Sequence, residues 1–191
     1  MTATSSSLSR RRFVVSTASA LATPYLRAQS KTAPEFHGEI VGHGEFRYRV
    51  DKLWSLADPA KTPVKDFHEM VQSSDGRLFL LTNHKQNNVL IYDVKGALLG
   101  MWTLGLGGAH GLTLHREADG KEFLYLTDPG AGRVVKATLD GQLVLELLHP
   151  AKCDAYKPTE DYRPTEAAIG PNGDIYVADG YGSPYVLRFD K

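Results

Sequence analysis

The sequence has little of several features that mark common protein classes. Its 191 residues contain one cysteine, Cys153, so no intramolecular disulfide can form. No apolar run approaches the ~18 residues that a membrane-spanning helix needs. Basic and acidic residues are equal in number, 22 each, and they do not show the clustered Lys and Arg of a nucleic-acid-binding surface. This charge distribution indicates a protein that binds no nucleic acid. Helical periodicity is also scarce, which favours an all-β protein.

The zero net charge is divided unevenly along the chain. Residues 1–28 contain four arginines and no acidic residue, so the remainder carries 18 basic against 22 acidic residues, a net charge of −4. The segment Ser9-Arg10-Arg11-Arg12-Phe13, followed by a mildly apolar stretch, resembles a twin-arginine export signal. This resemblance implies a protein that is exported folded to the periplasm or the extracellular space, with no membrane insertion after signal removal. The alternative is a basic, disordered N-terminus.

Three copies of one unit follow a mixed lead-in segment, residues 29–65, in which Phe46 to Val50 alternates like a strand. Each copy, within residues 66–191, combines an Asp-Gly or Asn-Gly turn, an apolar strand that ends in Asp or Asn, and a strand centred on Val. The apolar strands are expected at residues 78–83, 123–128 and 175–179. In the first two copies a further strand is expected, at residues 98–103 and 143–148.

The spacing of the repeat predicts the fold. Asn83 and Asp128 are 45 residues apart, and Asp128 and Asp179 are 51 residues apart. Four short strands in roughly 40–50 residues are the signature of a β-propeller blade. A β-sandwich also holds many short strands, but it has no reason to repeat strand-end residues at near-constant spacing. We therefore expect an all-β propeller with about three blades.

Three blades are fewer than the number that closes a propeller, which is at least about four. Two unpaired sheet edges would remain, and such edges promote association. We expect either that the chain is the N-terminal half of a longer protein or that it closes by self-association.

Two histidines recur one blade apart. His68 and His110 are 42 residues apart, each near the start of an expected innermost strand, and Thr165 holds the same place in the third unit. Innermost strands line the central channel, so the two imidazoles are expected to meet at its mouth. Imidazole nitrogen there suits Zn, Cu, Fe or Ni. The alternative is that each histidine only forms a hydrogen bond to a neighbouring blade.

A family resemblance rests on four segments, Ala109 to Leu114, Leu124 to Asp128, Arg163 to Ala168 and Tyr176 to Tyr181. They resemble NHL-repeat six-bladed propellers, and among these they are most similar to the peptidyl-α-hydroxyglycine α-amidating lyases. The resemblance implies that His110 binds zinc, that Tyr181 is catalytic, and that a small molecule or peptide binds at the channel mouth. The two further zinc-binding histidines of that family, and its first-blade arginine, have no counterpart in this sequence.

Two other functions remain open. One is a noncatalytic NHL propeller that binds a small molecule, peptide or protein partner. The other is a lactonase-like, Ca²⁺-dependent hydrolase, in which Glu69, Glu166 and Asp179 would supply oxygen ligands. A different role for Asp179 argues against these calcium ligands: Asp128 and Asp179 are expected to cap the loops that follow their strands. Tyr181 has its own alternative, as an exposed loop aromatic.

Overall fold

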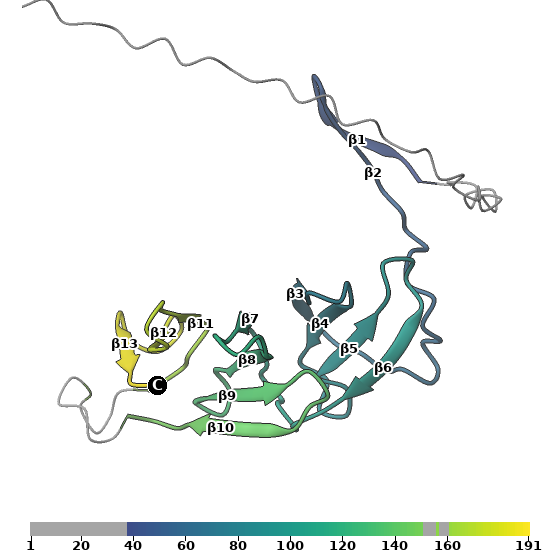
Figure 1. The fold of residues 1–191 in the computed structure, drawn as a ribbon. Coiled ribbons are helices and arrows are strands. Elements are labelled where there is room, and N and C mark those ends of the chain that lie inside the picture. Colours follow the sequence, from purple (N-terminus) through teal and green to yellow (C-terminus); the bar gives the residue numbers. More distant parts are fainter. Residues whose placement is uncertain (1–37, 151–155, 157–160) are drawn as a thin grey trace, which may run out of the picture. The chain divides into compact units, whose positions relative to one another are not determined.

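The computed structural model describes residues 38–150, 156 and 161–191. The export-signal segment, residues 29–37 of the lead-in and Cys153 lie outside this part. Every regular element in the described part is a β-strand (Figure 1). It contains no helix, and therefore none that is long and apolar enough to cross a membrane.

Three antiparallel sheets follow the three repeat units (Figure 1). The first sheet contains β3 (Phe67–Gln72), β4 (Leu78–Thr82), β5 (Val89–Tyr92) and β6 (Leu98–Trp102). The second contains β7 (Leu112–Arg116), β8 (Glu122–Asp128), β9 (Arg133–Thr138) and β10 (Leu143–Leu147). The third contains β11 (Glu166–Ile169), β12 (Ile175–Ala178) and β13 (Val186–Phe189). Each strand pairs with the next one along the chain, so every sheet is a simple meander.

The first strands of the three sheets lie next to one another. Strand β7 contacts β3 on one side and β11 on the other. This is how innermost strands are arranged around the channel of a propeller. The expected all-β fold with about three propeller blades is confirmed, and we refer to the three sheets as blades 1, 2 and 3.

The turn between the first two strands of each blade explains why the repeat is visible in the sequence. Gly76, Gly120 and Gly173 occupy equivalent positions with φ of +88°, +87° and +90°. In each case the glycine N–H donates to the carbonyl three residues earlier. Side chains are disfavoured at such φ values, so each unit keeps a glycine there.

Strand β8 is buried on both faces, and its residues alternate between two hydrophobic cores. Leu124 and Leu126 pack in the core shared with blade 1, against residues such as Phe79 and Leu81. Phe123 and Tyr125 pack in the core shared with blade 3, which also contains Ile175, Val177 and Leu187. The middle blade therefore needs a neighbour on each side to bury its apolar surface.

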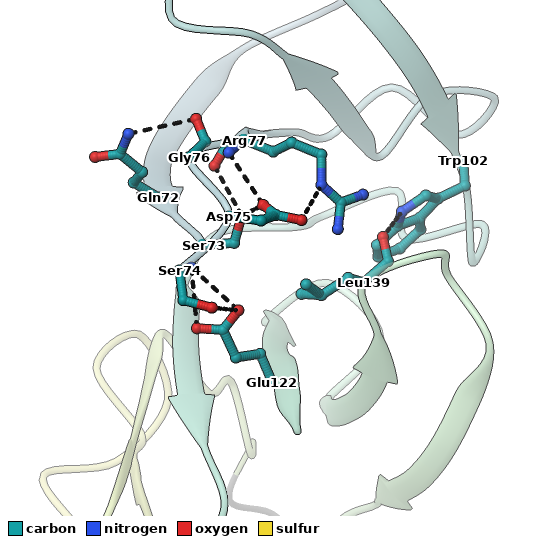
Figure 2. A network of polar contacts seen from close by, with 9 residues as sticks. All are labelled: Gln72, Ser73, Ser74, Asp75, Gly76, Arg77, Trp102, Glu122 and Leu139. Atoms are coloured by element: carbon teal, nitrogen blue, oxygen red, sulfur yellow. Dashed lines mark hydrogen bonds and ion pairs between the residues drawn. The ribbon is translucent and has the colours of Figure 1, made fainter. Parts of the chain in front are cut away.

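Polar contacts also join blade 1 to blade 2 at their periphery (Figure 2). The backbone N–H and the hydroxyl of Ser74 both donate to the carboxylate of Glu122, over 2.9 to 3.1 Å. The indole Nε1–H of Trp102 donates to the carbonyl of Leu139 over 3.1 Å. In Figure 2 both pairs bridge elements of the two sheets, so the apolar core between the blades is flanked by hydrogen bonds.

The described part of the lead-in contains a hairpin and a segment that packs on blade 1. The expected strand is β2 (Phe46–Arg49), which pairs with β1 (Ile40–His43), and the residues of both strands are exposed. Farther along, Trp54 packs against Tyr92 with the two rings tilted and their centroids 5.2 Å apart, and its Nε1–H donates to the carbonyl of Val94. The segment after the hairpin thus adds to the packing of the first blade.

Truncating a side chain in the core between blades 1 and 2 should destabilise the protein strongly. Leu124 is completely buried, so Leu124→Ala removes apolar contacts and leaves a cavity, at a cost of about 2–5 kcal/mol. Leu143, on β10, is 53% exposed, and Leu143→Ala should change the free energy of unfolding by about 0.5 kcal/mol or less. Urea unfolding of the two variants measures both values. Equal losses would contradict the burial of Leu124 in the core between blades 1 and 2.

Candidate functional site

His110 and Tyr181 form the centre of the candidate site. The Nε2 atom of His110 lies 2.9 Å from the hydroxyl oxygen of Tyr181, and the two rings meet edge to face. His110 lies two residues before β7, and Tyr181 lies in the loop that follows β12. Tyr181 is 56% exposed, so this pair faces solvent. The structure therefore brings together the two residues that the family resemblance singled out.

The second nitrogen of His110 determines which tautomer the imidazole adopts. Its Nδ1 lies 3.2 Å from the backbone carbonyl oxygen of Thr165, in blade 3. A carbonyl can only accept a hydrogen bond, so Nδ1 must carry the proton and neutral His110 keeps its lone pair on Nε2. That lone pair accepts the Tyr181 hydroxyl proton in the structure. The inter-blade hydrogen bond considered as an alternative role for His110 is thus present, and it orients the nitrogen that faces Tyr181.

His68 lies beside His110, with the two ring centroids 4.7 Å apart. The repeat predicted this meeting but assigned both histidines to the same strand position, which is wrong. His68 lies inside β3, whereas His110 precedes β7. Strand β3 carries one extra residue between Phe67 and Met70, so that His68 and Glu69 together face a single residue of β4. Such a bulge redirects side chains, and here it permits the ring contact with His110.

The environment of His68 favours the neutral imidazole. Partial burial lowers the pKa of His68, and the neighbouring His110 lowers it further, whereas Asp66 acts in the opposite direction. Neutral imidazole is the form that binds a metal ion. His68 therefore offers an imidazole in a chemical state suited to coordination, next to the ring of His110.

A pair of carboxyl groups lies next to the histidines on the innermost strands. Partial burial and a hydrogen bond to Glu166 raise the pKa of Glu69 to about 7. Glu69 also accepts the backbone N–H of Leu112, over 2.9 Å. The Glu166 carboxyl accepts the backbone N–H of Ala167 and lies 2.8 Å from the hydroxyl oxygen of Thr113, which also donates to the carbonyl of Ala167. Together these contacts link the innermost strands of the three blades.

The glycines of the two sequence motifs have a steric explanation. A Cβ at Gly111 would lie 2.4 Å from the carbonyl oxygen of Thr165, and a Cβ at Gly180 would lie 2.3 Å from the side-chain oxygen of Thr165. Both distances are far shorter than a carbon–oxygen contact allows. The His-Gly motif therefore requires glycine because the backbones of blades 2 and 3 meet at Thr165, and the Asp-Gly-Tyr motif requires it because the side chain of Thr165 packs against Gly180 within blade 3.

The two aspartates expected to cap loops do so. Asp128 is buried and accepts the backbone N–H groups of Gly130 and Ala131. Asp179 is also buried, and its carboxylate accepts the hydroxyl of Tyr156 and three backbone N–H groups from Arg163, Gly182 and Ser183. The carboxylate of Asp179 therefore supports the Tyr181 loop. It does not form a three-carboxylate group with Glu69 and Glu166.

Within the described residues no group of three or more His, Cys, Asp and Glu side chains could hold a metal ion. The site as described supplies two imidazoles, one phenol and a carboxyl pair.

Sequence reasoning missed two further residues. Arg163 lies over the ring of Tyr181, with its guanidinium carbon 6.0 Å from the ring centroid. Thr127 forms a hydrogen bond to the carbonyl of Thr165. The only sequence signal for Thr127 is that both of the first two units end their second strand in Thr followed by Asn or Asp.

Comparison with known proteins gives distant similarities. No protein-family model matches the sequence. A probable peptidyl-α-hydroxyglycine α-amidating lyase of Caenorhabditis elegans is 32% identical over 81 residues, which is 42% of this chain and 22% of that protein. The match therefore spans less than a quarter of the curated relative.

Two solved structures have a similar chain path. A streptogramin B lyase structure shares 17% identity, with 72% of this chain and 43% of that chain covered and a TM-score of 0.45. A catalytically inactive virginiamycin B lyase from Staphylococcus aureus, solved with quinupristin, shares 18% identity over 68% of this chain and 43% of that chain, with a TM-score of 0.46. From its own strands and contacts, the protein is a propeller-type all-β protein. Its sequence is distantly similar to an amidating lyase.

Adding a methyl group at Gly111 should disturb both stability and the site. Gly111→Ala places a Cβ against the Thr165 carbonyl, and such overpacking costs about 1–3 kcal/mol. Gly100 on β6 is the matched control, because a Cβ there meets nothing within 4 Å and its φ is not positive. Gly100→Ala should shift the free energy of unfolding by about 1 kcal/mol or less. Urea unfolding compares the two variants, and a tolerated Gly111→Ala would contradict the close approach of the blades.

Replacing Glu69 by glutamine should flatten the pH dependence of stability. The pKa of Glu69 is raised from 4.5 to about 7, so the folded protein holds this proton more tightly than the unfolded chain. The stability that this bound proton contributes to the folded protein is fully present below pH 4.5 and is lost as the pH rises through 7. Glu69→Gln keeps an amide that can donate to Glu166, and its stability relative to the original protein should increase between these pH values. Denaturant unfolding in metal-free buffer across this range measures the slope, with Glu45→Gln in the β1–β2 turn as the control. The same slope in both variants would show that Glu69 ionises normally.

Proposed function

We propose that this protein is a metal-dependent, lyase-type propeller that cleaves peptides ending in α-hydroxyglycine, and that it is exported by the twin-arginine route. The hydrogen bond between His110 Nε2 and the Tyr181 hydroxyl carries the proposal. It joins the two residues to which the amidating-lyase resemblance assigns metal binding and catalysis. The 81-residue similarity to a probable amidating lyase supports the same class of protein.

Zn²⁺ is the proposed metal, and His110 and His68 would hold it. His110 fits this role because the Thr165 carbonyl holds its Nδ1–H and leaves the Nε2 lone pair directed at the site. His68 fits because its lowered pKa keeps the ring neutral. A catalytic zinc takes about three protein ligands, so the proposal requires at least one ligand beyond these two.

The two possible partners of Nε2 exclude one another. A neutral imidazole nitrogen has one lone pair, which either accepts the Tyr181 hydroxyl proton or binds a metal ion. Metal binding would therefore release the phenol of Tyr181, which would remain close by because of its loop. The released hydroxyl is then available to a substrate.

The proposed reaction moves one proton from oxygen to nitrogen. When bound, zinc would lower the pKa of the substrate hydroxyl. Tyr181 donates its proton to the amide nitrogen as the carbon–nitrogen bond breaks, and the electron pair of that bond stays on nitrogen. The hydroxyl oxygen forms the new carbonyl of glyoxylate, and its proton restores Tyr181. The products are a primary amide and glyoxylate, with no water or oxidant consumed.

The test combines metal content with glyoxylate release from an acyl-α-hydroxyglycine peptide. The protein should contain stoichiometric zinc and release glyoxylate, and His110→Ala should abolish both. Tyr181→Phe should retain zinc while turnover falls by about 10²–10⁴-fold, the usual contribution of a general acid–base group. Tyr176→Phe, on β12, and His84→Ala, in the loop after β4, are the matched controls and should keep both zinc and activity.

Two outcomes would overturn the proposal. Zinc that survives His110→Ala would remove His110 from the metal site. A protein that binds no zinc and releases no glyoxylate would instead be a noncatalytic propeller, with the same cluster serving as a binding surface for a small molecule or peptide.

A further inference from the structure

The hydroxyl of Thr127 lies between two backbone groups of different blades. Thr127 is in β8 and is completely buried. Its Oγ1 accepts the N–H of Gly111 over 2.7 Å and donates to the carbonyl of Thr165 over 2.9 Å. An N–H can only donate and a carbonyl can only accept, so the single hydroxyl proton must point to Thr165. With no exposed surface at Thr127, water cannot readily replace this bridge.

Both groups that form hydrogen bonds to the Thr127 hydroxyl are also connected to His110. Gly111 is the next residue in the chain, and the Thr165 carbonyl is the acceptor for His110 Nδ1. In addition, the backbone N–H of His110 donates to the carbonyl of Thr127 over 2.9 Å. Thr127 therefore contacts the main chain at His110 and, across the blade boundary, the oxygen that sets the tautomer of its ring.

We propose that Thr127 is a positioning residue for His110: its hydroxyl holds the Thr165 carbonyl at Nδ1 and so keeps the reactive lone pair on Nε2. Losing the hydroxyl would leave the carbonyl and the Gly111 N–H without their shared partner, and the two blades would separate slightly at this point. The imidazole would then exchange more freely between tautomers. The use of this arrangement in catalysis rests on the proposed function, but the tautomer itself requires neither metal nor turnover.

Blade 1 contains a matched control for this role. Thr82 is the last residue of β4, is also completely buried, and corresponds to Thr127 in the repeat. Its hydroxyl oxygen accepts the N–H groups of Lys65 and His84, and no contact links it to His110. A threonine hydroxyl that only stabilises a blade is thus available for comparison in the same protein.

The test measures the tautomer of His110 directly in the metal-free protein. Histidine is labelled with nitrogen isotope, and long-range proton–nitrogen correlation spectra are recorded at a pH where the ring is neutral. Comparison with His110→Gln identifies the signals of His110. The original protein and Thr127→Ser should show mainly the Nδ1–H form. Thr127→Val should lower the ratio of the Nδ1–H to the Nε2–H form by about fivefold, the effect of one ordinary hydrogen bond on an equilibrium.

The control separates positioning from stability. Thr82→Val should destabilise the protein without changing the His110 tautomer ratio. An unchanged ratio in Thr127→Val, or an equal change in Thr82→Val, would overturn the proposal. If Thr127→Val does not fold, Thr127→Cys replaces the hydroxyl by a weaker donor of similar size, and an unchanged ratio there would overturn it equally. Because no assay of activity enters, a failure of the lyase proposal would leave this result intact.

Discussion

The burial of blade 2 on both faces is the constraint on which the rest of the structure depends. Successive residues of β8 point into different cores, Leu124 and Leu126 toward blade 1 and Phe123 and Tyr125 toward blade 3. Buried apolar surface stabilises a fold by about 25 cal/mol per Å², so both neighbours must pack closely against this sheet. That packing places β3, β7 and β11 side by side. His68, His110 and Tyr181, which belong to three different blades, meet only because the blades stack in this way.

The same close approach shapes the chemistry of the site. Blades 2 and 3 meet at the Thr165 carbonyl, where a Cβ on Gly111 has no room. Polar groups at this depth must find partners across the blade boundary, because an unsatisfied buried donor or acceptor is costly. The Thr165 carbonyl accepts from His110 and Thr127, and Thr113 forms a hydrogen bond with the Glu166 carboxyl. Packing between blades and the protonation state of the site residues are therefore consequences of one geometry.

Local patterns in the sequence were sufficient for the blades. The turn glycines, the apolar second strands and the strand-end aspartates depend on a few neighbouring residues, and the structure confirms each of them. The meeting of His68 with His110 was also predicted, because a constant repeat brings equivalent positions together. The strand position of His68 was wrong, since the extra residue in β3 leaves no mark in a pattern of apolar and polar residues. The raised pKa of Glu69 was not foreseen, because the separate positions of Glu69 and Glu166 in the sequence do not reveal the hydrogen bond between them.

The sequence by itself determined the all-β class, the repeat of about three blades, and the residue types available for chemistry. These follow from turn glycines and strand alternation, which act over distances of a few residues. Only the tertiary structure decided which nitrogen of His110 faces Tyr181, that the pKa of Glu69 is raised, and that Thr127 forms a hydrogen bond to the carbonyl that His110 also contacts. Each of these depends on contacts between residues tens of positions apart. Their geometry is set by the packing of one blade against the next, which no local pattern encodes.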